Sequence, residues 1–486
     1  MIQTLNEKHF FSEKCIFYLF ILGEKCIFAG GKTEEKCMLK RKIQTEIVDY
    51  LEKGSDKILI LNGARQIGKS YIIRYEGQKR FENYIEIDLY EDKKGDKVFE
   101  NTRNKEDFYI RLSTIAGNRM KEKHNTLVFL DEIQAYPDML TLLKFLKQDD
   151  RFTYIVSGSQ LGLALNETLS KPGGKIKVVK MYQLDFEEFI WANGVGQEFI
   201  DFARKCFKQQ TALSESLHNK MMDLFKKYLL VGGLPDAVNK FVETHNIVEV
   251  RDAQKEVYEL YKGDASQYDK EKKLVIGRVY ELVPSYLENR KKRVRFNEIE
   301  NKKQARAVQY KDEFEYLVNS GICNEVKAIS NPKFPLVESE SKNLLKLYLN
   351  DVGLLTRLLY QYSISAIMGD ERSVNIGSVY ESVVCGEFAA HGFQLFYYDN
   401  KKKGEIEFLL NNYDLLSVIP VEVKSGKDYD EHASLDAFIS TPDYNIKQAF
   451  VLSNEREVRK KGQVTYLPVY YAMFFVPSTP PKDVIL

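Results

Sequence analysis

Eight consecutive residues have types and spacing that could bind a nucleotide phosphate. They follow the pattern G-x-x-x-x-G-K-[ST], directly after the apolar run at 58–61. The set is Gly63, Ala64, Arg65, Gln66, Ile67, Gly68, Lys69 and Ser70, followed by Tyr71 at the start of a helix-like segment. Glycines let the backbone N–H groups turn toward an anion, Lys69 would reach the β and γ phosphates, and the Ser70 hydroxyl would bind Mg²⁺. The pattern therefore predicts a site for ATP and Mg²⁺ between a strand and a helix.

Two carboxylates follow another apolar run, in the segment "NTLVFLDEIQ" at 125–134. At the end of a parallel strand Asp131 would hold Mg²⁺, and Glu132 would orient and polarise the attacking water. The next apolar run, in "FTYIVSGSQ", ends at Ser157 and Ser159. Their hydroxyls either bind the γ-phosphate or the attacking water, or simply form a turn, and both readings stay open. Together these residues predict hydrolysis of ATP as well as its binding.

Five segments occur in an order that is specific as a set. They are "GARQIGKS" (63–70), "LDEIQ" (130–134), "VSGSQ" (156–160), "MYQLDFEEFIWA" (181–192) and "YLLVGGLPDAV" (228–238). In this order they resemble the prokaryotic AAA-type P-loop ATPases that carry a C-terminal domain of unknown function with a restriction-endonuclease-like, PD-(D/E)xK core. The resemblance runs from about Met38 to near the C-terminus, and it implies a winged helix between the ATPase core and the C-terminal domain. Lys175 stands where many relatives have arginine, which leaves the source of an arginine finger open.

The segment "IPVEVKSG" at 419–426 could hold a second metal-dependent site. Because strand side chains alternate, Glu422 and Lys424 share a face opposite Val421 and Val423. With a carboxylate on the preceding strand, this is the arrangement in which carboxylates bind Mg²⁺ and a lysine positions the attacking hydroxide in restriction-type nucleases. A surface ion pair between Glu422 and Lys424 is the alternative.

The resemblance extends to two further carboxylates of this second site. Glu407, in "GEIEF", stands where relatives usually have aspartate, and Glu381 in "GSVYESVVCGEF" matches the acidic helix residue of that fold. The metal set is therefore Glu381, Glu407 and Glu422. The longer side chain at 407 displaces its carboxylate by about one bond length, so the resemblance predicts the nuclease fold more firmly than nuclease activity.

The elements that must position these residues alternate along the chain. Short apolar runs at 58–61, 84–89, 127–130, 154–156 and 176–179 are separated by segments of helical length, which predicts an α/β fold with a parallel sheet. The predicted divisions are a leader at 1–37, an ATPase core at 38–195, a helical lid at 196–262, a winged-helix segment at 263–340 and an endonuclease-like α/β domain at 341–486. In the leader, Cys15, Cys26 and Cys37 repeat with a period of eleven that fits neither a zinc site nor a helical repeat, so we predict that it is dispensable and weakly ordered.

The overall composition restricts the partners. The chain has 486 residues, 29% of them charged, but a net charge of only +1, so any basic surface must be local. No apolar run has the length needed to span a bilayer, and we expect a cytoplasmic protein without a membrane partner. His124 and His391 have no partners at metal-ligand spacing in the sequence, and we expect ordinary histidines.

One basic segment could contact nucleic acid. Its members are Arg290, Lys291, Lys292, Arg293 and Arg295. It lies in the predicted winged-helix segment, a fold that can place a helix in a DNA groove, but glutamates alternate with it and it could equally be a solvated or domain-packing face. DNA or RNA is therefore a candidate partner, as is a second copy of the chain.

Two functions follow as hypotheses. The first is a Mg²⁺-dependent ATPase coupled to a nuclease-like domain. The second is a non-catalytic nucleotide-dependent switch, or a DNA-binding regulator, whose nuclease fold is inactive; Lys175 and Glu407 favour this second version.

Overall fold

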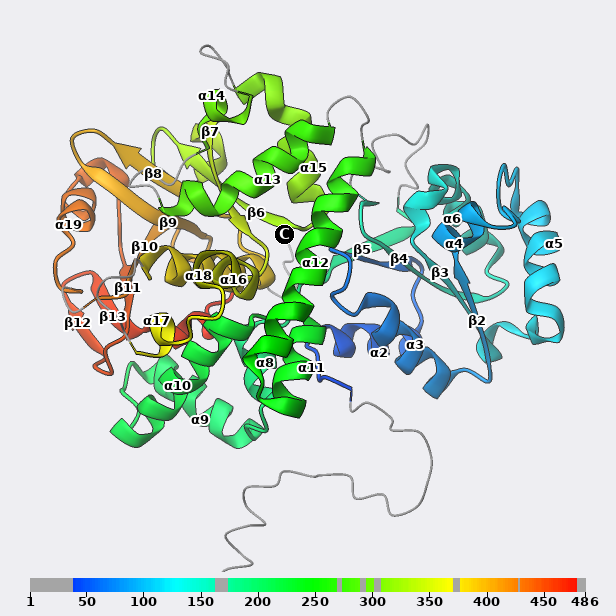
Figure 1. The fold of residues 1–486 in the computed structure, drawn as a ribbon, viewed down its shortest axis with the longest axis horizontal. Coiled ribbons are helices and arrows are strands. Elements are labelled where there is room, and N and C mark those ends of the chain that lie inside the picture. Colours follow the sequence, from blue (N-terminus) through cyan, green and yellow to red (C-terminus); the bar gives the residue numbers. More distant parts are fainter. Residues whose placement is uncertain are drawn as a thin grey trace, which may run out of the picture.

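The computed structural model describes residues 38–161, 174–268, 273–288, 294–300, 307–369, 376–426 and 429–478. Two β-sheets lie on opposite sides of a set of helices, and the long helix α12 (Ile247–Tyr268) runs between them (Figure 1). The predicted leader, and residues 290–293 of the basic segment, lie outside the described residues. The two sheets separate the predicted phosphate site from the C-terminal carboxylates.

The first sheet has five parallel strands in the order β2-β3-β4-β1-β5. The strands are β1 (Ile58–Asn62), β2 (Asn83–Asp88), β3 (Thr126–Asp131), β4 (Thr153–Gly158) and β5 (Ile176–Lys180). The helices are α2 (Ile43–Lys53), α3 (Lys69–Arg80), α4 (Leu89–Lys94), α5 (Lys105–Ala116) and α6 (Pro137–Asp149). Every residue of β1 and β3 is buried, as a parallel sheet covered on both faces requires. The predicted parallel α/β sheet is confirmed.

Helices α8 to α12 follow this sheet. They are α8 (Phe186–Ala192), α9 (Gln197–Gln209), α10 (Glu215–Val231), α11 (Pro235–Thr244) and α12. The turn between α10 and α11 is held by Asp351, a buried residue from far along the chain. Its carboxylate accepts hydrogen bonds from the Gly233 N–H at 2.6 Å and from the Leu354 N–H at 3.0 Å, so it also caps α16 (Val352–Tyr360). This contact joins the segment "VGGLPDAV" at 231–238 to residues 349–355 in one buried junction.

The second sheet has eight strands in the order β12-β13-β11-β10-β9-β8-β6-β7. They are β6 (Cys323–Ile329), β7 (Glu340–Leu349), β8 (Phe396–Asn400), β9 (Gly404–Asn412), β10 (Ser417–Lys424), β11 (Ala449–Ser453), β12 (Arg459–Lys461) and β13 (Val464–Pro468). Its helices are α13 (Lys273–Glu288), α14 (Phe296–Ile299), α15 (Lys311–Asn319), α16, α17 (Ser365–Met368), α18 (Gly377–Ala390) and α19 (Ala433–Ile439). Because β6 pairs with both β7 and β8, this sheet runs across the division predicted at residue 340.

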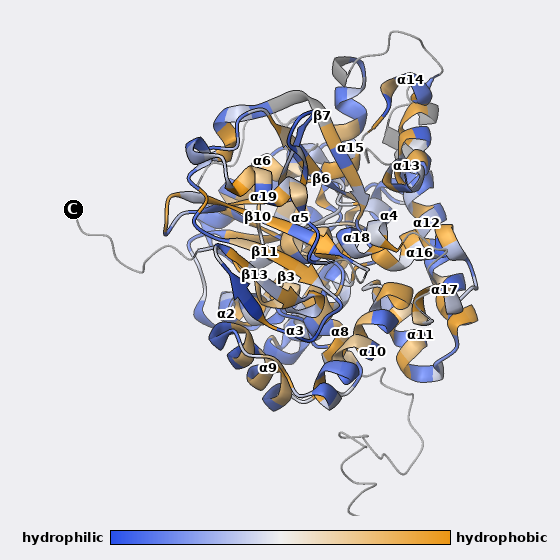
Figure 2. Ribbon diagram, turned by 90° about the vertical axis from the view of Figure 1, so that its left-hand side faces the viewer, coloured by the Kyte–Doolittle hydropathy of each residue, from blue (hydrophilic) through white to orange (hydrophobic). Residues whose placement is uncertain are grey.

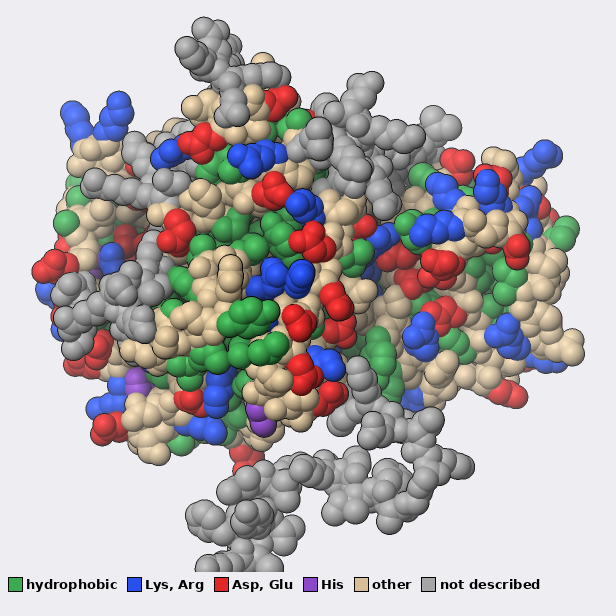
Figure 3. Space-filling view, in the orientation of Figure 1, with side chains coloured by type: hydrophobic (Ala, Val, Ile, Leu, Met, Phe, Trp, Pro, Cys, Tyr) green, Lys and Arg blue, Asp and Glu red, His purple; other side chains and the backbone are tan. Residues whose placement is uncertain are grey.

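Burial follows the same layers. Hydrophobic residues run through interior strands such as β3 and β10, whereas the outer helices mix both kinds of residue (Figure 2). On the face shown in Figure 3 basic and acidic side chains are interspersed. In the part of the chain that the structure describes, no helix is both long and apolar enough to cross a bilayer.

Candidate nucleotide site and carboxylate cluster

The loop that is predicted to bind phosphate, residues 63–68, connects β1 to α3 at the carboxyl edge of the parallel sheet. Gly68 takes φ 91° and Gln66 takes φ 60°, the left-handed region in which glycine is favoured, so the loop curls back over the start of α3. A Cβ at Gly63 would lie 2.2 Å from the carbonyl oxygen of Met181, so only glycine fits at this position. The loop thus ends at the N-terminus of α3, where the spacing predicts an anion site.

Lys69 lies inside this loop and is only 5% exposed. Its ammonium donates to the carbonyl oxygens of Gly63 at 2.9 Å and Ala64 at 2.8 Å. Burial lowers the pKa of Lys69, although the charges of Glu132 and Asp131 oppose that shift. The lysine side chain and both carboxylates therefore face one site.

Asp131 ends β3 and is held by hydroxyl groups. Its Oδ1 accepts hydrogen bonds from Ser157 Oγ and from the Glu132 N–H, the latter at 3.0 Å. Burial raises the pKa of Asp131, and hydrogen bonds from Ser157 and from Ser70 of the loop act against it. Ser70 and Asp131, the two residues predicted to bind Mg²⁺, are thus in contact.

Glu132 adopts a left-handed backbone conformation with φ 52°, which aims its side chain back across the strand ends. Its Oε2 accepts a hydrogen bond from Ser159 Oγ at 2.9 Å and another from Gln134 Nε2. Burial alone would raise its pKa, but the Lys69 ammonium and these hydrogen bonds hold the pKa of Glu132 below the ordinary value. At neutral pH Glu132 is a carboxylate that can accept a proton.

The two serines and Tyr71 are placed as follows. Ser157 contacts Asp131 and Ser159 contacts Glu132, so both serine hydroxyls support the carboxylates. The side chain of Tyr71 is 45% exposed on α3. Gln134, which bridges Glu132 and Ser159, was missed by sequence reasoning, although it is the last residue of "LDEIQ".

Residues from distant segments also touch the loop. Tyr261 on α12 donates to the Arg65 carbonyl oxygen at 2.8 Å, and Asp264 accepts from the Arg65 guanidinium at 2.6 Å. A Cβ on Gly321, in the turn between α15 and β6, would lie 3.0 Å from the Ala64 nitrogen. No local signal identifies these contacts, because their partners lie far away in the sequence. A cavity of about 400 Å³ beside the loop is lined by Arg65, Tyr90, Lys93, Lys94, Gln134, Ala135, Gln160 and Asp264.

The C-terminal carboxylates come together on the second sheet. Glu381 lies on α18, Glu407 on β9 and Glu422 with Lys424 on β10, which is antiparallel to β9. Glu407 Oε2 accepts from the Val423 N–H at 2.5 Å, which holds it beside β10. The pKa of Lys424 is raised by the charges of Glu422, Glu407 and Glu381, although burial opposes the shift. The carboxylates of these three residues therefore act on the same ammonium.

Glu422 is buried, at 3% exposed, and its Oε2 lies 3.2 Å from Lys424 Nζ. Its other oxygen has no hydrogen-bond partner among the described residues. Burial raises the pKa of Glu422, with Lys424 acting against the shift. Glu422 is therefore too buried for the alternative of an exposed surface pair: one of its oxygens faces an ammonium and the other has no hydrogen bond among the described residues.

Three family models match separate stretches of the chain. Residues 55–190 match the model of an AAA domain, residues 222–363 match a domain of unknown function (DUF8612), and residues 376–472 match another (DUF4143). Curated proteins gave no match to this chain. Residues 55–190 therefore form an AAA-type P-loop ATPase domain.

Several solved structures are similar at low identity. The Walker-type ATPase of Pyrococcus abyssi is 13% identical, with 68% of this chain and 98% of that chain covered and a TM-score of 0.42. The RuvB Holliday junction branch migration motor of Thermotoga maritima is 14% identical, with 59% and 89% covered and a TM-score of 0.27. Hsp104 of S. cerevisiae with ADP is 14% identical, with 57% and 37% covered and a TM-score of 0.27.

Proposed function

We propose that the chain binds ATP with Mg²⁺ and hydrolyses it at the edge of the five-stranded sheet. The observation that carries the proposal is that the buried Lys69 ammonium, the Ser70–Asp131 contact and the Glu132 carboxylate come together between the loop and the ends of β3 and β4. A hydroxyl and a carboxylate suit Mg²⁺, which usually takes few protein ligands and keeps water in its remaining positions. Glu132 then acts on the attacking water, while the loop amides and Lys69 stabilise the charge of the transferring phosphoryl group.

Removal of Mg²⁺ is the direct test. We expect phosphate release from ATP by the purified full chain in millimolar Mg²⁺, and background release after the metal is chelated with EDTA, since the metal neutralises the phosphate charge in the transition state. Restored release on adding excess Mg²⁺ is the control for damage by the chelator. Release that continues unchanged in EDTA would rule out this mechanism.

We further propose that nucleotide state is transmitted to the second sheet. Supporting contacts are those of Tyr261 and Asp264 with Arg65, the close approach of Gly321 to Ala64, and a hydrogen bond from Gln160 Nε2 to the Tyr316 hydroxyl at 3.1 Å. Gln160 follows β4 and Tyr316 lies on α15, which leads into β6. A movement of the loop when phosphate binds would therefore press on the helix and turn that begin the second sheet.

A second candidate function is metal-dependent cleavage of nucleic acid by a restriction-endonuclease-like core, reached through a winged helix. The buried Glu422 next to Lys424, facing Glu381 and Glu407, favours it. The alternative is an inactive nuclease fold that serves as a nucleotide-controlled binding module, with DNA or RNA as the candidate partner.

Plasmid nicking separates these alternatives. We expect wild-type chain with Mg²⁺ or Mn²⁺ to nick supercoiled plasmid, and Lys424→Ala to lower the rate by about 10²–10⁴-fold, because the lysine positions the nucleophile. Lys460→Ala, which changes an exposed lysine on β12, is the matched control. Equal rates for wild type and Lys424→Ala, or an absence of metal-dependent nicking, would leave the binding module as the function.

A further inference from the structure

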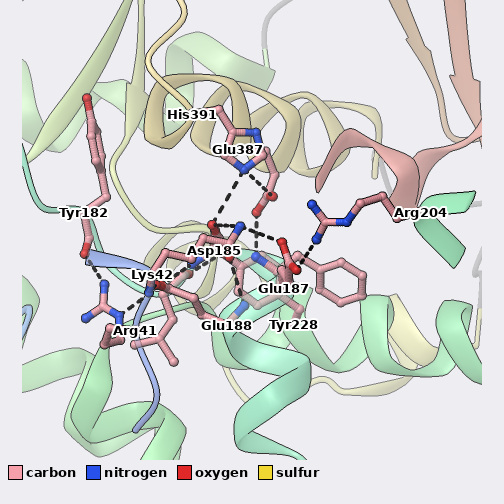
Figure 4. Close-up of polar contacts among 12 residues, drawn as sticks. Arg41, Lys42, Tyr182, Asp185, Glu187, Glu188, Arg204, Tyr228, Glu387 and His391 are labelled. Atoms are coloured by element: carbon pink, nitrogen blue, oxygen red, sulfur yellow. Dashed lines mark hydrogen bonds and ion pairs between the residues drawn. The ribbon is translucent and has the colours of Figure 1, made fainter. Parts of the chain in front are cut away.

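A cluster of buried ionisable groups lies where the segment between β5 and α8 meets the end of α18, and none of its residues belongs to the two sites described above. Its centre is formed by Asp185, the residue before α8, and by Glu387 and His391 at the end of α18 (Figure 4). The three offer one ligand atom each, and these atoms all lie within 4.8 Å of one another. His391, for which the sequence showed no partner at metal-ligand spacing, lies beside Glu387 from the preceding helical turn and Asp185 from a segment about two hundred residues away.

Each carboxylate has one oxygen held by the backbone and another turned toward the histidine. Asp185 Oδ1 accepts from the Glu188 N–H at 2.9 Å, and Glu387 Oε1 accepts from the Phe186 N–H at 2.7 Å. The second oxygens lie 3.6 Å (Asp185) and 3.9 Å (Glu387) from His391 Nε2. The backbone therefore holds both carboxylates in place without using the oxygens that face His391.

Polar atoms at the centre are buried without hydrogen bonds. The side chains of His391 and Glu387 are 7% and 2% exposed, and neither ring nitrogen of His391 nor Oε2 of Glu387 has a hydrogen-bond partner among the described residues. Leaving such groups without hydrogen bonds in the interior is unfavourable. Side chains of this kind, aimed at one point, indicate a ligand that all of them share.

The surrounding charges leave the centre short of positive charge. Glu188 is paired with the Arg41 guanidinium at 3.0 Å, and Glu187 with Arg204. Lys42 Nζ lies 2.6 Å from Asp185 Oδ2 and 2.9 Å from Glu187 Oε2, and the His391 ring is the other group that faces both Asp185 and Glu387. Metal binding requires a neutral imidazole, and with His391 neutral a single ammonium faces the two carboxylates. An added cation would supply the positive charge that is then missing.

We propose that Asp185, Glu387 and His391 bind a divalent transition-metal ion of the zinc class. One imidazole nitrogen and two carboxylate oxygens suit Zn²⁺, whereas Mg²⁺ and Ca²⁺ prefer oxygen alone. Ligands at zinc–ligand distances of about 2.0–2.2 Å in a tetrahedron lie roughly 3.3–3.6 Å apart, close to the observed separations from Nε2. A cavity of about 290 Å³, lined by Lys42, Asp185 and His391 among others, gives the ion a path from solvent and leaves room for a water as fourth ligand.

The ion would join two parts of the chain that act in the proposed function. Asp185 lies between β5 of the ATPase sheet and α8, while Glu387 and His391 follow Glu381 on the helix that covers β10. Binding would therefore fix α18 against the ATPase side of the molecule. This inference is independent of whether either proposed activity occurs.

Cobalt and zinc titrations test the site. The full chain is treated with chelator, dialysed and placed in excess Mg²⁺ to occupy oxygen-only sites; Co²⁺ is then added. We expect one equivalent to give the strong visible absorption of four-coordinate Co²⁺, and one equivalent of Zn²⁺ to remove it. His391→Gln should weaken Zn²⁺ binding by about 100-fold, while His218→Gln, a change at another buried histidine, should leave it unchanged. Absent absorption, or equal Zn²⁺ affinity in wild type and His391→Gln, would overturn the proposal.

Lys42→Met provides a second readout that does not depend on removing a ligand. The ammonium competes with a metal for Asp185, so its loss should tighten Zn²⁺ binding by about tenfold. A site that exists only as a network of ion pairs would bind no better after this change. Unchanged or weaker Zn²⁺ affinity in Lys42→Met, with circular dichroism matching wild type, would contradict the assignment of Asp185 as a ligand.

Discussion

Replacing Lys69 by alanine is expected to lower ATP turnover by about 10²–10³-fold, since it removes a preorganised cation from the position where phosphoryl charge develops. Lys69 is not an exposed surface charge. It is buried, and its ammonium contacts the loop carbonyl oxygens of Gly63 and Ala64. ATP affinity should fall as well, since Lys69 faces the bound phosphates as well as the transition state.

Phosphate release and equilibrium binding of a fluorescent ATP analogue measure the two effects separately. Lys79→Ala is the matched control, because Lys79 lies on the same helix, α3, with its side chain exposed. Circular dichroism shows whether the loop variant is folded. Turnover by Lys69→Ala equal to that of Lys79→Ala would mean that the loop does not bind the triphosphate.

The parts of the fold that the sequence predicted best are those whose cause is local. The apolar run at 58–61 becomes β1, and the glycines and Lys69 that follow it need only the adjoining strand and helix to form a curled loop. Asp131 and Glu132 could be placed because parallel strands bring their carboxyl ends to one edge. Strand alternation likewise placed Glu407 and Glu422 on neighbouring strands, which the structure shows as β9 and β10.

Burial at the C-terminal carboxylates was harder to foresee. Strand alternation correctly separates Glu422 from Val421 and Val423, but it says nothing about what covers each face. In β10 both faces are covered, so Glu422 is as buried as its apolar neighbours. Whether the second face is covered depends on where α18 packs, and the sequence of the strand alone does not predict that.

The sequence did not predict the contacts between distant segments. Tyr261 and Asp264 on α12 contact Arg65, and Asp185 contacts His391 from about two hundred residues away in the sequence. Glu387 and His391 are four residues apart on one helix, a spacing that places two side chains on the same face. Their partner Asp185 also caps α8, a role that fully accounts for its residue type in the sequence. The metal hypothesis therefore depends on the fold, which brings these three residues together.

Replacing Glu132 by glutamine separates binding from hydrolysis. The substitution keeps the size of the side chain and an oxygen that can accept from Ser159, but it removes the proton acceptor. We expect turnover to fall by about 10²–10⁴-fold, the usual contribution of a general base, while ATP affinity stays within a few fold of wild type. The carboxylate is available for this role because Lys69 keeps the pKa of Glu132 low.

The informative result is whether each variant loses ATP binding, ATP turnover or both. Lys69 acts on the phosphates and Glu132 on the water, so loss of the first should impair both binding and turnover, and loss of the second only turnover. Single-turnover measurements with saturating ATP isolate the chemical step, and Glu122→Gln, on an exposed carboxylate, serves as the control. If Glu132→Gln hydrolyses ATP at the wild-type rate, then another group activates the water. If instead it loses ATP binding, then Glu132 holds the nucleotide site together, and its contacts with Ser159 and Gln134 are structural.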